Sequence, residues 1–387
     1  MTLDRSAPIS ADATASVAPP AVELIDATEL ADRLARGERV TVLDLREDVA
    51  WGIDAPSVRA RQLDYASALS APAELARELD GPVAVVCNRG ISAQSVARAL
   101  RARGVDAVAV RDGMRGWIHA LQARPVELGV DGLAVVQVQR PGRGCLSYLL
   151  LAGGRALVVD PAPDPDFYLE LADELGGRIT DVFDTHLHAD HLSGARALSE
   201  RAGAALRLPV GALERGVAYA DEVTALADGD TVPLGGVEVR ALALPGHTTD
   251  MTGLLLADRA LVSGDSLFVD GLARPDLQQV DPAGARAMAR QLHATLHERV
   301  LALGDDVVVL PGHTHPRVNS APVVASLGEI RRNVPELAID DAAQFADVLL
   351  RDMPPRPANY ETIIAVNSGR HPFDPALETG GNSCSTR

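Results

Sequence analysis

The sequence contains no lysine, so all 36 basic residues are arginines, and 53 acidic residues bring the formal charge to −17. This acidic excess argues against nonspecific nucleic-acid binding, which needs basic side chains to neutralise phosphates. No apolar run reaches the roughly 18 residues that a membrane helix requires. The first residues also lack the basic and then apolar build of a secretory signal. We therefore expect a soluble, cytoplasmic protein that binds neither nucleic acid nor membrane.

Cysteine is scarce as well. Cys87, Cys145 and Cys384 lie far apart and are odd in number, which argues against a disulfide framework. Cys145 borders a predicted strand, and we interpret it as a small core residue. We interpret Cys384 as a reduced thiol in a tail. The length of 387 residues predicts two or three domains with buried cores, and the 47% apolar fraction excludes wholesale disorder.

The first part of the sequence predicts one α/β unit behind a disordered leader. Residues 1–21 are rich in Ala, Ser, Thr and Pro and have no apolar period. In residues 22–125, apolar runs at 40–45 and 82–87 predict buried strands, and helical spacing follows over 92–103. Strands and helices in this alternation imply a parallel sheet covered on both faces.

A different pattern covers residues 131–370. Antiparallel strand pairs with glycine-rich turns are mixed with predicted helices, which indicates a sheet-on-sheet core with helices outside. Residues 371–387 form a C-terminal tail.

Histidines and aspartates gather at the ends of the predicted strands of this second unit. Four groups follow apolar runs, each beside a small residue, and strand ends hold such side chains at fixed positions. Residues i and i+2 of an extended segment share a face, so we expect His186 and His188 to converge on one point. This clustering predicts a metal site. Its candidate ligands are His186, His188, Asp190, His191, His247, Asp265 and His313.

A cysteine marks the first unit in a similar position. Cys87 ends a predicted strand and precedes a helix, where unpaired N–H groups and the helix dipole stabilise a thiolate or a persulfide anion. Gly90 permits a tight loop around the sulfur, and Arg89 adds positive charge. The alternative is a small buried residue at a strand end.

The histidine pattern resembles the metallo-β-lactamase fold superfamily over residues 131–370, which implies an αββα sandwich with a metal at one edge. The stretch Arg274-Pro275-Asp276-Leu277-Gln278 after Asp265 resembles the persulfide dioxygenases, whereas glyoxalase II typically has a different segment there. That resemblance implies one Fe(II) per chain, held by His186, His247 and Asp265. Two histidines and one carboxylate leave open positions for a thiolate and dioxygen. Under this interpretation the remaining candidates, His188, Asp190, His191 and His313, become pocket groups or a second metal position.

Residues 22–125 resemble a single rhodanese domain, on Asp44-Leu45-Arg46-Glu47, the loop after Cys87, and the stretch 111–117. This resemblance implies that Cys87 carries sulfur as a persulfide. The predicted fold class is therefore an α/β rhodanese domain followed by an αββα metallo-β-lactamase-fold sandwich. We expect a fusion that oxidises a low-molecular-weight thiol persulfide, such as glutathione persulfide, to sulfite with dioxygen. Arg274 is predicted to orient the anionic substrate.

Two alternatives stay open. The first is a two-zinc thioester or lactone hydrolase of the glyoxalase II type, in which all seven candidate ligands hold metal. The second is a persulfide sensor or carrier without activity. The sequence names neither the thiol carrier nor the oligomeric state, and it leaves a homodimer open.

Overall fold

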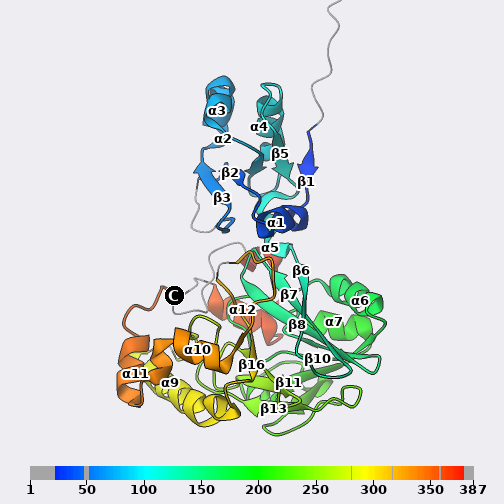
Figure 1. Cartoon of the computed structure of the whole chain (residues 1–387), viewed down its shortest axis with the longest axis vertical. Coiled ribbons are helices and arrows are strands. Elements are labelled where there is room, and N and C mark those ends of the chain that lie inside the picture. Colours follow the sequence, from blue (N-terminus) through cyan, green and yellow to red (C-terminus); the bar gives the residue numbers. More distant parts are fainter. Residues whose placement is uncertain (1–21, 48–51, 280, 316, 357–358, 379–387) are drawn as a thin grey trace, which may run out of the picture.

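A computed structural model of the chain describes residues 22–47, 52–279, 281–315, 317–356 and 359–378 (Figure 1). The predicted leader and Cys384 lie outside these residues. An N-terminal α/β unit with one sheet precedes a larger unit with two sheets. Within the described ranges, no helix combines the length and apolar character that crossing a bilayer demands.

A parallel sheet with the strand order β1-β5-β4-β2-β3 organises the N-terminal unit. Alternate residues of its strands enter two different cores, since successive side chains of a strand point to opposite faces. In β4, Ala84 and Val86 pack with α1 and α5, whereas Val83 and Val85 pack with α2, α3 and α4. The strands are β1 (Leu24–Ile25), β2 (Val40–Asp44), β3 (Val58–Gln62), β4 (Val83–Val86) and β5 (Ala107–Val110). The helices are α1 (Ala27–Ala35), α2 (Tyr65–Ser70), α3 (Pro72–Glu78), α4 (Ile91–Arg101) and α5 (Gly113–His119).

The parallel sheet covered on both faces agrees with the α/β class predicted for this unit. The rhodanese assignment within that class stays a prediction.

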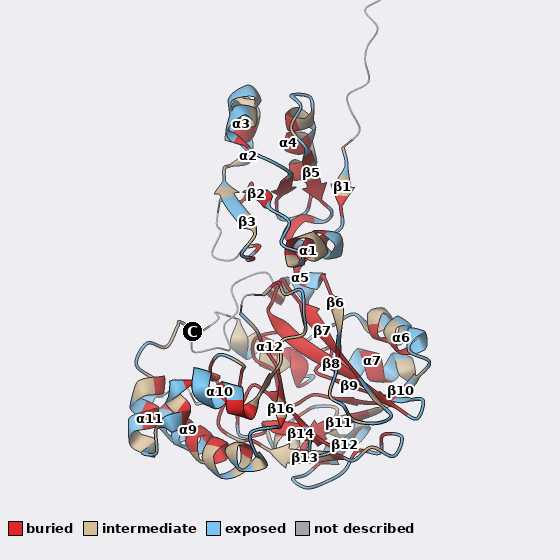
Figure 2. Ribbon diagram, viewed as in Figure 1, coloured by how far each residue is buried: buried red, intermediate tan, exposed pale blue. Residues whose placement is uncertain are grey.

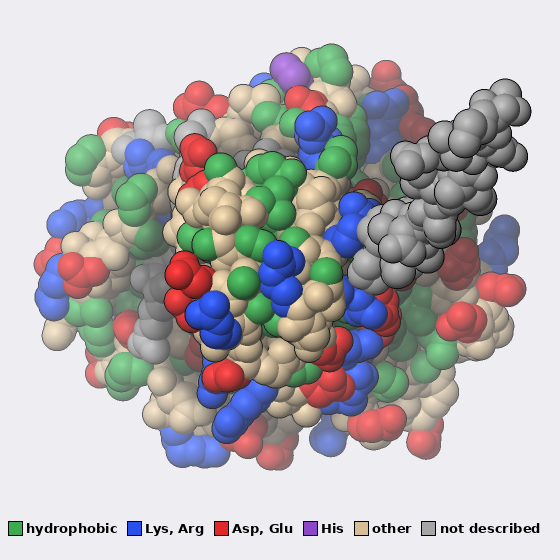
Figure 3. All heavy atoms as spheres, turned by 90° about the horizontal axis from the view of Figure 1, so that it is seen from above, with side chains coloured by type: hydrophobic (Ala, Val, Ile, Leu, Met, Phe, Trp, Pro, Cys, Tyr) green, Lys and Arg blue, Asp and Glu red, His purple; other side chains and the backbone are tan. Residues whose placement is uncertain are grey.

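On the face seen in Figure 3, basic and acidic side chains are interspersed over the surface of the molecule.

The boundary predicted between the two units, at residues 125–131, lies after the start of the second unit, because one strand of that unit comes earlier in the chain. Strand β6 (Gln122–Val126) pairs antiparallel with β7 (Leu133–Arg140) and forms the edge of the seven-stranded sheet. Pro125 is tolerated there because an edge strand does not need every N–H for pairing. The sheet of the second unit therefore begins at Gln122.

Two mixed sheets form the larger unit. The first has the order β12-β11-β10-β9-β8-β7-β6, and the second has the order β13-β14-β15-β16-β17. The remaining strands of the first sheet are β8 (Cys145–Ala152), β9 (Arg155–Val159), β10 (Arg178–Phe183), β11 (Ala205–Pro209) and β12 (Val223–Leu226). The second sheet contains β13 (Val239–Ala243), β14 (Thr252–Leu256), β15 (Ala260–Gly264), β16 (Val308–Pro311) and β17 (Ala325–Ser326).

The two sheets pack face to face, and helices cover both outer faces (Figures 1 and 2). Along β8, Leu146, Tyr148 and Leu150 enter the core between the sheets, while Leu149 points to the helices on the outside. This alternation produces four layers, which is the predicted αββα sandwich. The α-helices are α6 (Pro165–Glu174), α7 (Ala195–Ala202), α8 (Val210–Glu214), α9 (Pro282–Thr295), α10 (Leu327–Asn333), α11 (Ala342–Leu349) and α12 (Tyr360–Asn367). Short helical turns are η1 (Ala220–Glu222), η2 (Leu296–Val300), η3 (Leu301–Leu303), η4 (Pro335–Ala338) and η5 (Pro375–Glu378).

Candidate metal centre

One edge of the sandwich collects the histidine groups. Strands β9 and β10 run parallel in one sheet, and β15 and β16 run parallel in the other, so the loops after them leave at common edges. Backbone hydrogen bonds join the two sheets at this place: the Leu146 N–H donates to Gly312 O at 2.8 Å, and the Thr252 N–H donates to Thr185 O at 2.9 Å. The ligand-bearing loops are therefore held by both sheets at once.

Three predicted ligands form a compact triad. One ligand atom each of His186, His247 and Asp265 lies within 4.8 Å of the others. All three side chains are buried, with no more than 1% of any residue exposed. Among the described residues, His186 Nε2, His247 Nε2 and Asp265 Oδ2 have no hydrogen-bond partner. Buried polar atoms without partners are costly, and three that face one point fit a bound cation.

Hydrogen bonds on the opposite side of each imidazole hold the triad in position. Thr185 Oγ1 donates to Asp160 at 2.9 Å, so it accepts from the His186 Nδ1–H, also at 2.9 Å. The His247 Nδ1–H donates to the carbonyl oxygen of Arg274 at 2.7 Å. Both rings therefore carry their proton on Nδ1 and leave the Nε2 lone pair for a metal, as metal-binding histidines require.

The carboxylate of the triad is held in the same way. Asp265 Oδ1 accepts from His313 Nδ1 at 2.8 Å, which leaves Oδ2 as the ligand atom. A Cβ on Gly312 would lie 2.4 Å from Asp265 Oδ1, so only glycine permits this approach. Although burial opposes it, His313 holds the pKa of Asp265 below its usual range, while burial and His188 lower the pKa of His186. Ionised Asp265 and neutral His186 are the protonation states that bind a metal.

His188 lies beside His186, as expected, but its Nε2 belongs to another group than the triad. Its Nε2 lies 3.1 Å from Asp160 Oδ1 and 3.8 Å from Asp184 Oδ1, and these three form a cluster of their own. Against the effect of burial, Asp160 raises the pKa of His188 well above its usual value. The two histidines lie side by side, with ring centroids 4.3 Å apart. The carboxylates hold the Nε2 side of His188, and its Nδ1 has no hydrogen-bond partner among the described residues. Asp160 follows β9 directly. The pattern that identified the other groups, a polar residue directly after a predicted strand, therefore also applies to Asp160.

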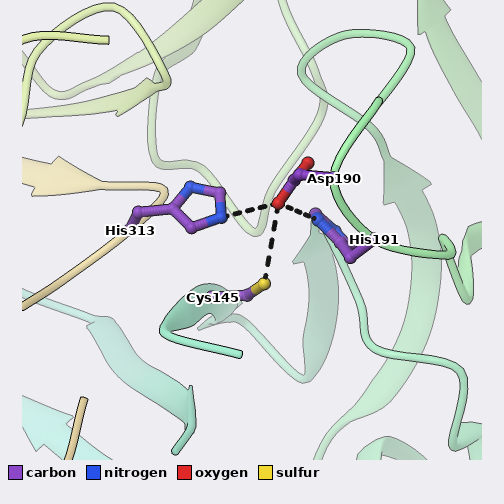
Figure 4. Close-up of side chains that lie close together, drawn as sticks. All are labelled: Cys145, Asp190, His191 and His313. Atoms are coloured by element: carbon purple, nitrogen blue, oxygen red, sulfur yellow. Dashed lines mark hydrogen bonds and ion pairs between the residues drawn. The ribbon is translucent and has the colours of Figure 1, made fainter. Parts of the chain in front are cut away.

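The other predicted ligands meet a few ångströms away, around Asp190 (Figure 4). Asp190 Oδ2 lies 2.9 Å from His191 Nδ1 and 2.8 Å from His313 Nε2. Cys145 Sγ lies 3.9 Å from the same oxygen. We call Cys145, Asp190, His191 and His313 the four-group cluster, whose ligand atoms all lie within 4.8 Å of one another.

The interpretation of Cys145 as a core residue misses this position. Cys145 is buried, but its sulfur faces polar groups (Figure 4). Burial raises the pKa of the thiol, and His191 and His313 outweigh this effect and lower the pKa to about 6. The sequence offered only its place at the start of a predicted strand, and the backbone bridge that brings it opposite His313 is visible in the structure alone.

Arg274 does not take the substrate-binding position predicted for it. Its guanidinium is buried, donates to both Asp276 carboxylate oxygens at 2.7 and 3.1 Å, and donates to the Pro354 carbonyl at 2.6 Å. These contacts occupy the side chain, while its backbone carbonyl holds His247. We therefore replace the predicted role with a positioning role.

Cys87 and Arg89 belong to the N-terminal unit, in the loop between β4 and α4. Cys87 is buried in the apolar cluster around Leu43 and Val85, and Arg89 is exposed. Gly90 caps α4 in the left-handed conformation with φ of 73°, as the tight loop requires. The sulfur-carrying role of Cys87 stays a prediction.

Two residues distant in the sequence support the metal loop, and no local pattern predicts them. Asn367, at the end of α12, donates from Nδ2 to the carbonyls of His188 and His191 at 3.0 and 2.9 Å. Glu378, fully buried, accepts from the Leu192 N–H at 3.0 Å and forms a bidentate pair with Arg140 at 2.9 and 2.6 Å. Against burial, Arg140 lowers the pKa of Glu378 to about 2.

Comparison with known proteins agrees with this geometry. Residues 140–313 match the family model of the metallo-beta-lactamase superfamily. A hydroxyacylglutathione hydrolase of Acidiphilium cryptum is 35% identical over 174 residues, which are 45% of this chain and 66% of that relative's length. The mitochondrial persulfide dioxygenase ETHE1 of Bos taurus is 26% identical over 57% of this chain and 83% of its own.

The crystal structure of ETHE1 from Myxococcus xanthus is similar as well. It superposes with a TM-score of 0.52 and 32% identity, and it covers 61% of this chain and 98% of its own. Thus both a hydrolase and a dioxygenase are among the relatives. By family match, sequence identity and fold, the chain belongs to the metallo-beta-lactamase superfamily.

Proposed function

We propose that the chain is a persulfide dioxygenase with a single catalytic iron. The observation that carries this proposal is the separation of the triad from its neighbours. His186 Nε2, His247 Nε2 and Asp265 Oδ2 face one metal position, while His188 Nε2 pairs with Asp160 and Asp265 Oδ1 bonds His313. Two histidines and one carboxylate with open positions are typical of non-haem Fe(II) oxygenases.

The substrate is a low-molecular-weight thiol persulfide, such as glutathione persulfide. One persulfide, one dioxygen and one water become one thiol, one sulfite and two protons, so the outer sulfur is oxidised and dioxygen is reduced. Fe(II) in the triad would supply redox activity and vacant positions where sulfur and dioxygen meet. His186 and His247, oriented by Thr185 and by the Arg274 carbonyl, keep their lone pairs aimed at the ion.

In this proposal the N-terminal unit supplies persulfide. The Cys87 thiolate attacks the outer sulfur of thiosulfate, sulfite leaves with the bonding electrons, and the resulting cysteine persulfide passes its outer sulfur to the free thiol. The position of Cys87 between β4 and the N-terminus of α4 supports this step, because helix N-terminal amides stabilise sulfur anions.

A two-zinc hydrolase is the second candidate function. The four-group cluster beside the triad favours it, since it provides donors for another ion. The hydroxyacylglutathione hydrolase among the relatives supports the same reading. A hydrolase of this type would cleave a glutathione thioester with a metal-activated water.

Metal analysis with two assays separates the candidates. The dioxygenase is expected to hold about one iron per chain, to consume oxygen with glutathione persulfide, and to release sulfite. Cleavage of a hydroxyacylglutathione thioester by a protein holding two zinc ions, without oxygen uptake, would overturn the proposal. For the N-terminal unit, Cys87→Ser is expected to abolish oxygen uptake from thiosulfate plus glutathione and to keep uptake from ready-made glutathione persulfide. Unchanged uptake from thiosulfate would remove Cys87 from the reaction.

A further inference from the structure

A cavity of about 690 Å³ lies beside α7 and the end of α12. Its volume is within the range typical of small-molecule sites. The walls come from the start of α7, from Tyr219 just before η1, and from the last residues of α12 with the segment that follows them. None of the seven candidate metal ligands lines the cavity. The cavity is therefore separate from the metal centre.

The apolar part of the lining includes two aromatic rings. Phe373 exposes 55% of its surface, and covering an exposed ring with a ligand removes a large apolar area from water. Two contacts hold the ring of Tyr219. Its hydroxyl donates to the Asn367 carbonyl at 2.7 Å, and the Arg196 guanidinium lies 4.9 Å from the ring centroid. These rings favour a ligand with a flat apolar body.

The charged part of the lining contains one cation without a balancing carboxylate. Arg196 is paired with Glu200 at 3.3 Å and with Glu222 at 3.2 Å. Arg370 donates from Nε to Ser368 Oγ at 2.8 Å, and no carboxylate in the described ranges forms an ion pair with its guanidinium. The remaining guanidinium donors of Arg370 suit a carboxylate, sulfonate or phosphate group. The cavity therefore favours an anion, although the whole chain carries a formal charge of −17.

Two lining residues also hold the loop that carries His188 and His191. Asn367 accepts from the Ser193 N–H at 3.0 Å and donates to the carbonyls of both histidines. Ser193 donates from Oγ to Asp184 at 2.6 Å. A ligand in the cavity contacts the side chains that position this loop. Ordering them in advance lowers the cost of holding the loop in its metal-binding shape.

We propose that this cavity is a regulatory site for a small organic anion with an aromatic body, and that its occupation raises the affinity of the centre for metal. The anionic group pairs with Arg370, and the aromatic body covers Phe373. Because coupling between two sites is reciprocal, bound metal strengthens binding of the anion by the same factor. The coupling concerns metal retention, so it applies to one iron or to two zinc ions and does not depend on the proposed function.

Two fluorescent probes test the site. Anilinonaphthalene sulfonate is an aromatic anion, and N-phenylnaphthylamine is its counterpart without the sulfonate. We expect the full-length protein to bind one equivalent of the sulfonate and to bind the neutral probe at least about tenfold more weakly, since a hydrogen bond to a charged group is lost. Arg370→Gln should weaken binding of the sulfonate about tenfold and leave the neutral probe unchanged.

A cavity-filling variant and a matched control complete this measurement. Ala197 is an exposed lining residue of α7, so Ala197→Trp should fill the cavity and abolish binding of both probes. Arg201→Gln removes an exposed arginine of α7 that does not line the cavity and pairs with Asp166, and it should bind both probes like the unmodified chain. Equal affinities for the two probes, or binding that survives in Ala197→Trp, would overturn the anion site. Circular dichroism checks that each variant folds.

Co²⁺ measures the coupling to the metal centre. Competition with a chelator should show a Co²⁺ affinity at least about fivefold higher when the sulfonate saturates the protein. This increase should be absent in Ala197→Trp and present in Arg201→Gln. An unchanged Co²⁺ affinity at saturating sulfonate would overturn the regulatory role. The measurement uses neither persulfide nor oxygen, so its result is independent of the dioxygenase assay.

Discussion

The triad and the four-group cluster lie at the same edge of the sandwich, yet they compensate their buried charges differently. In the triad, His186 Nε2, His247 Nε2 and Asp265 Oδ2 have no hydrogen-bond partner among the described residues. In the four-group cluster, Asp190 Oδ2 is within 2.9 Å of nitrogen atoms of both His191 and His313. Protons on these imidazoles can therefore balance Asp190 when no ion is bound.

We therefore expect the two positions to respond differently to metal loss. A triad whose ligand atoms face one another without partners gains most from an ion, because nothing else satisfies them. The cluster exchanges protons for an ion at a smaller net gain. We therefore expect metal removal to perturb the triad first.

The largest expected effect comes from His247→Ala, which removes a triad ligand. Loss of an oriented ligand exceeds the 10- to 100-fold effects typical of residues that only support ligands, so oxygen uptake with glutathione persulfide should fall by more than about 100-fold. Iron content, measured on purified protein, should fall with it. The matched control is His293→Ala, a buried histidine that bonds the Ile339 carbonyl at 2.8 Å, and it should keep its iron. If His247→Ala kept its iron and its activity, the proposed difference between the triad and the four-group cluster would be wrong.

Glu378→Gln tests the buried ion pair of Arg140 with Glu378, whose carboxylate also accepts from the Leu192 N–H in the metal loop. The variant leaves Arg140 buried without its carboxylate partner. Because the pKa of Glu378 is about 2 in the folded chain and ordinarily 4.5, the ion pair contributes stability above pH 4.5 that disappears as the pH falls toward 2. This difference corresponds to about 3 kcal/mol.

Urea unfolding should show this loss near neutral pH, and the gap between Glu378→Gln and the unmodified chain should shrink at about pH 3. Glu361→Gln, an exposed change on α12, serves as the control. A gap that stays constant across this range would contradict the role of the ion pair.

Iron addition to metal-free protein should stabilise the fold through the triad. Free iron at about 100 times its dissociation constant adds about 2.7 kcal/mol to the free energy of unfolding. The shift, followed by anaerobic thermal unfolding, should vanish in His247→Ala. An equal shift in that variant would place the responding site in the four-group cluster.

Thr185→Val is expected to have the smallest of these effects. It removes the hydroxyl that accepts from His186 Nδ1 but leaves all three ligands. Iron affinity should fall by about 10- to 100-fold, the usual range for such supporting contacts. Thr180→Val, in β10 with its hydroxyl on Asp181, is the matched control. Competition with a chelator measures both, and equal affinities would show that Thr185 does not orient the ring.

The rule that polar residues at the ends of neighbouring strands lie close together predicts most of the metal centre from the sequence. Residues at the carboxyl ends of neighbouring strands must meet, so His247, Asp265 and His313 follow from local patterns and fold class alone. The rule does not say which group joins which ion. That depends on groups such as Asp160 and Asp184, which hold the Nε2 side of His188.

Other features depend on contacts that no local pattern contains. Arg140 and Glu378 are 238 positions apart, and Asn367 lies 176 positions from His191. Strand β6 was missed for a different reason, since Pro125 looks like a terminator unless the strand is known to lie at a sheet edge. Secondary-structure propensity depends on residues that are close in sequence, whereas the positions of Glu378, Asn367 and β6 depend on residues that are close in space.

The hydrogen bond from the Leu192 N–H to the Glu378 carboxylate has a consequence for biosynthesis. Its carboxylate arrives 186 residues after the amide that it holds. A nascent chain on the ribosome therefore carries every proposed ligand, from Cys145 to His313, well before Glu378 is translated. Ion capture before that moment would meet a loop without its final support, so maturation of the centre should follow completion of residue 378.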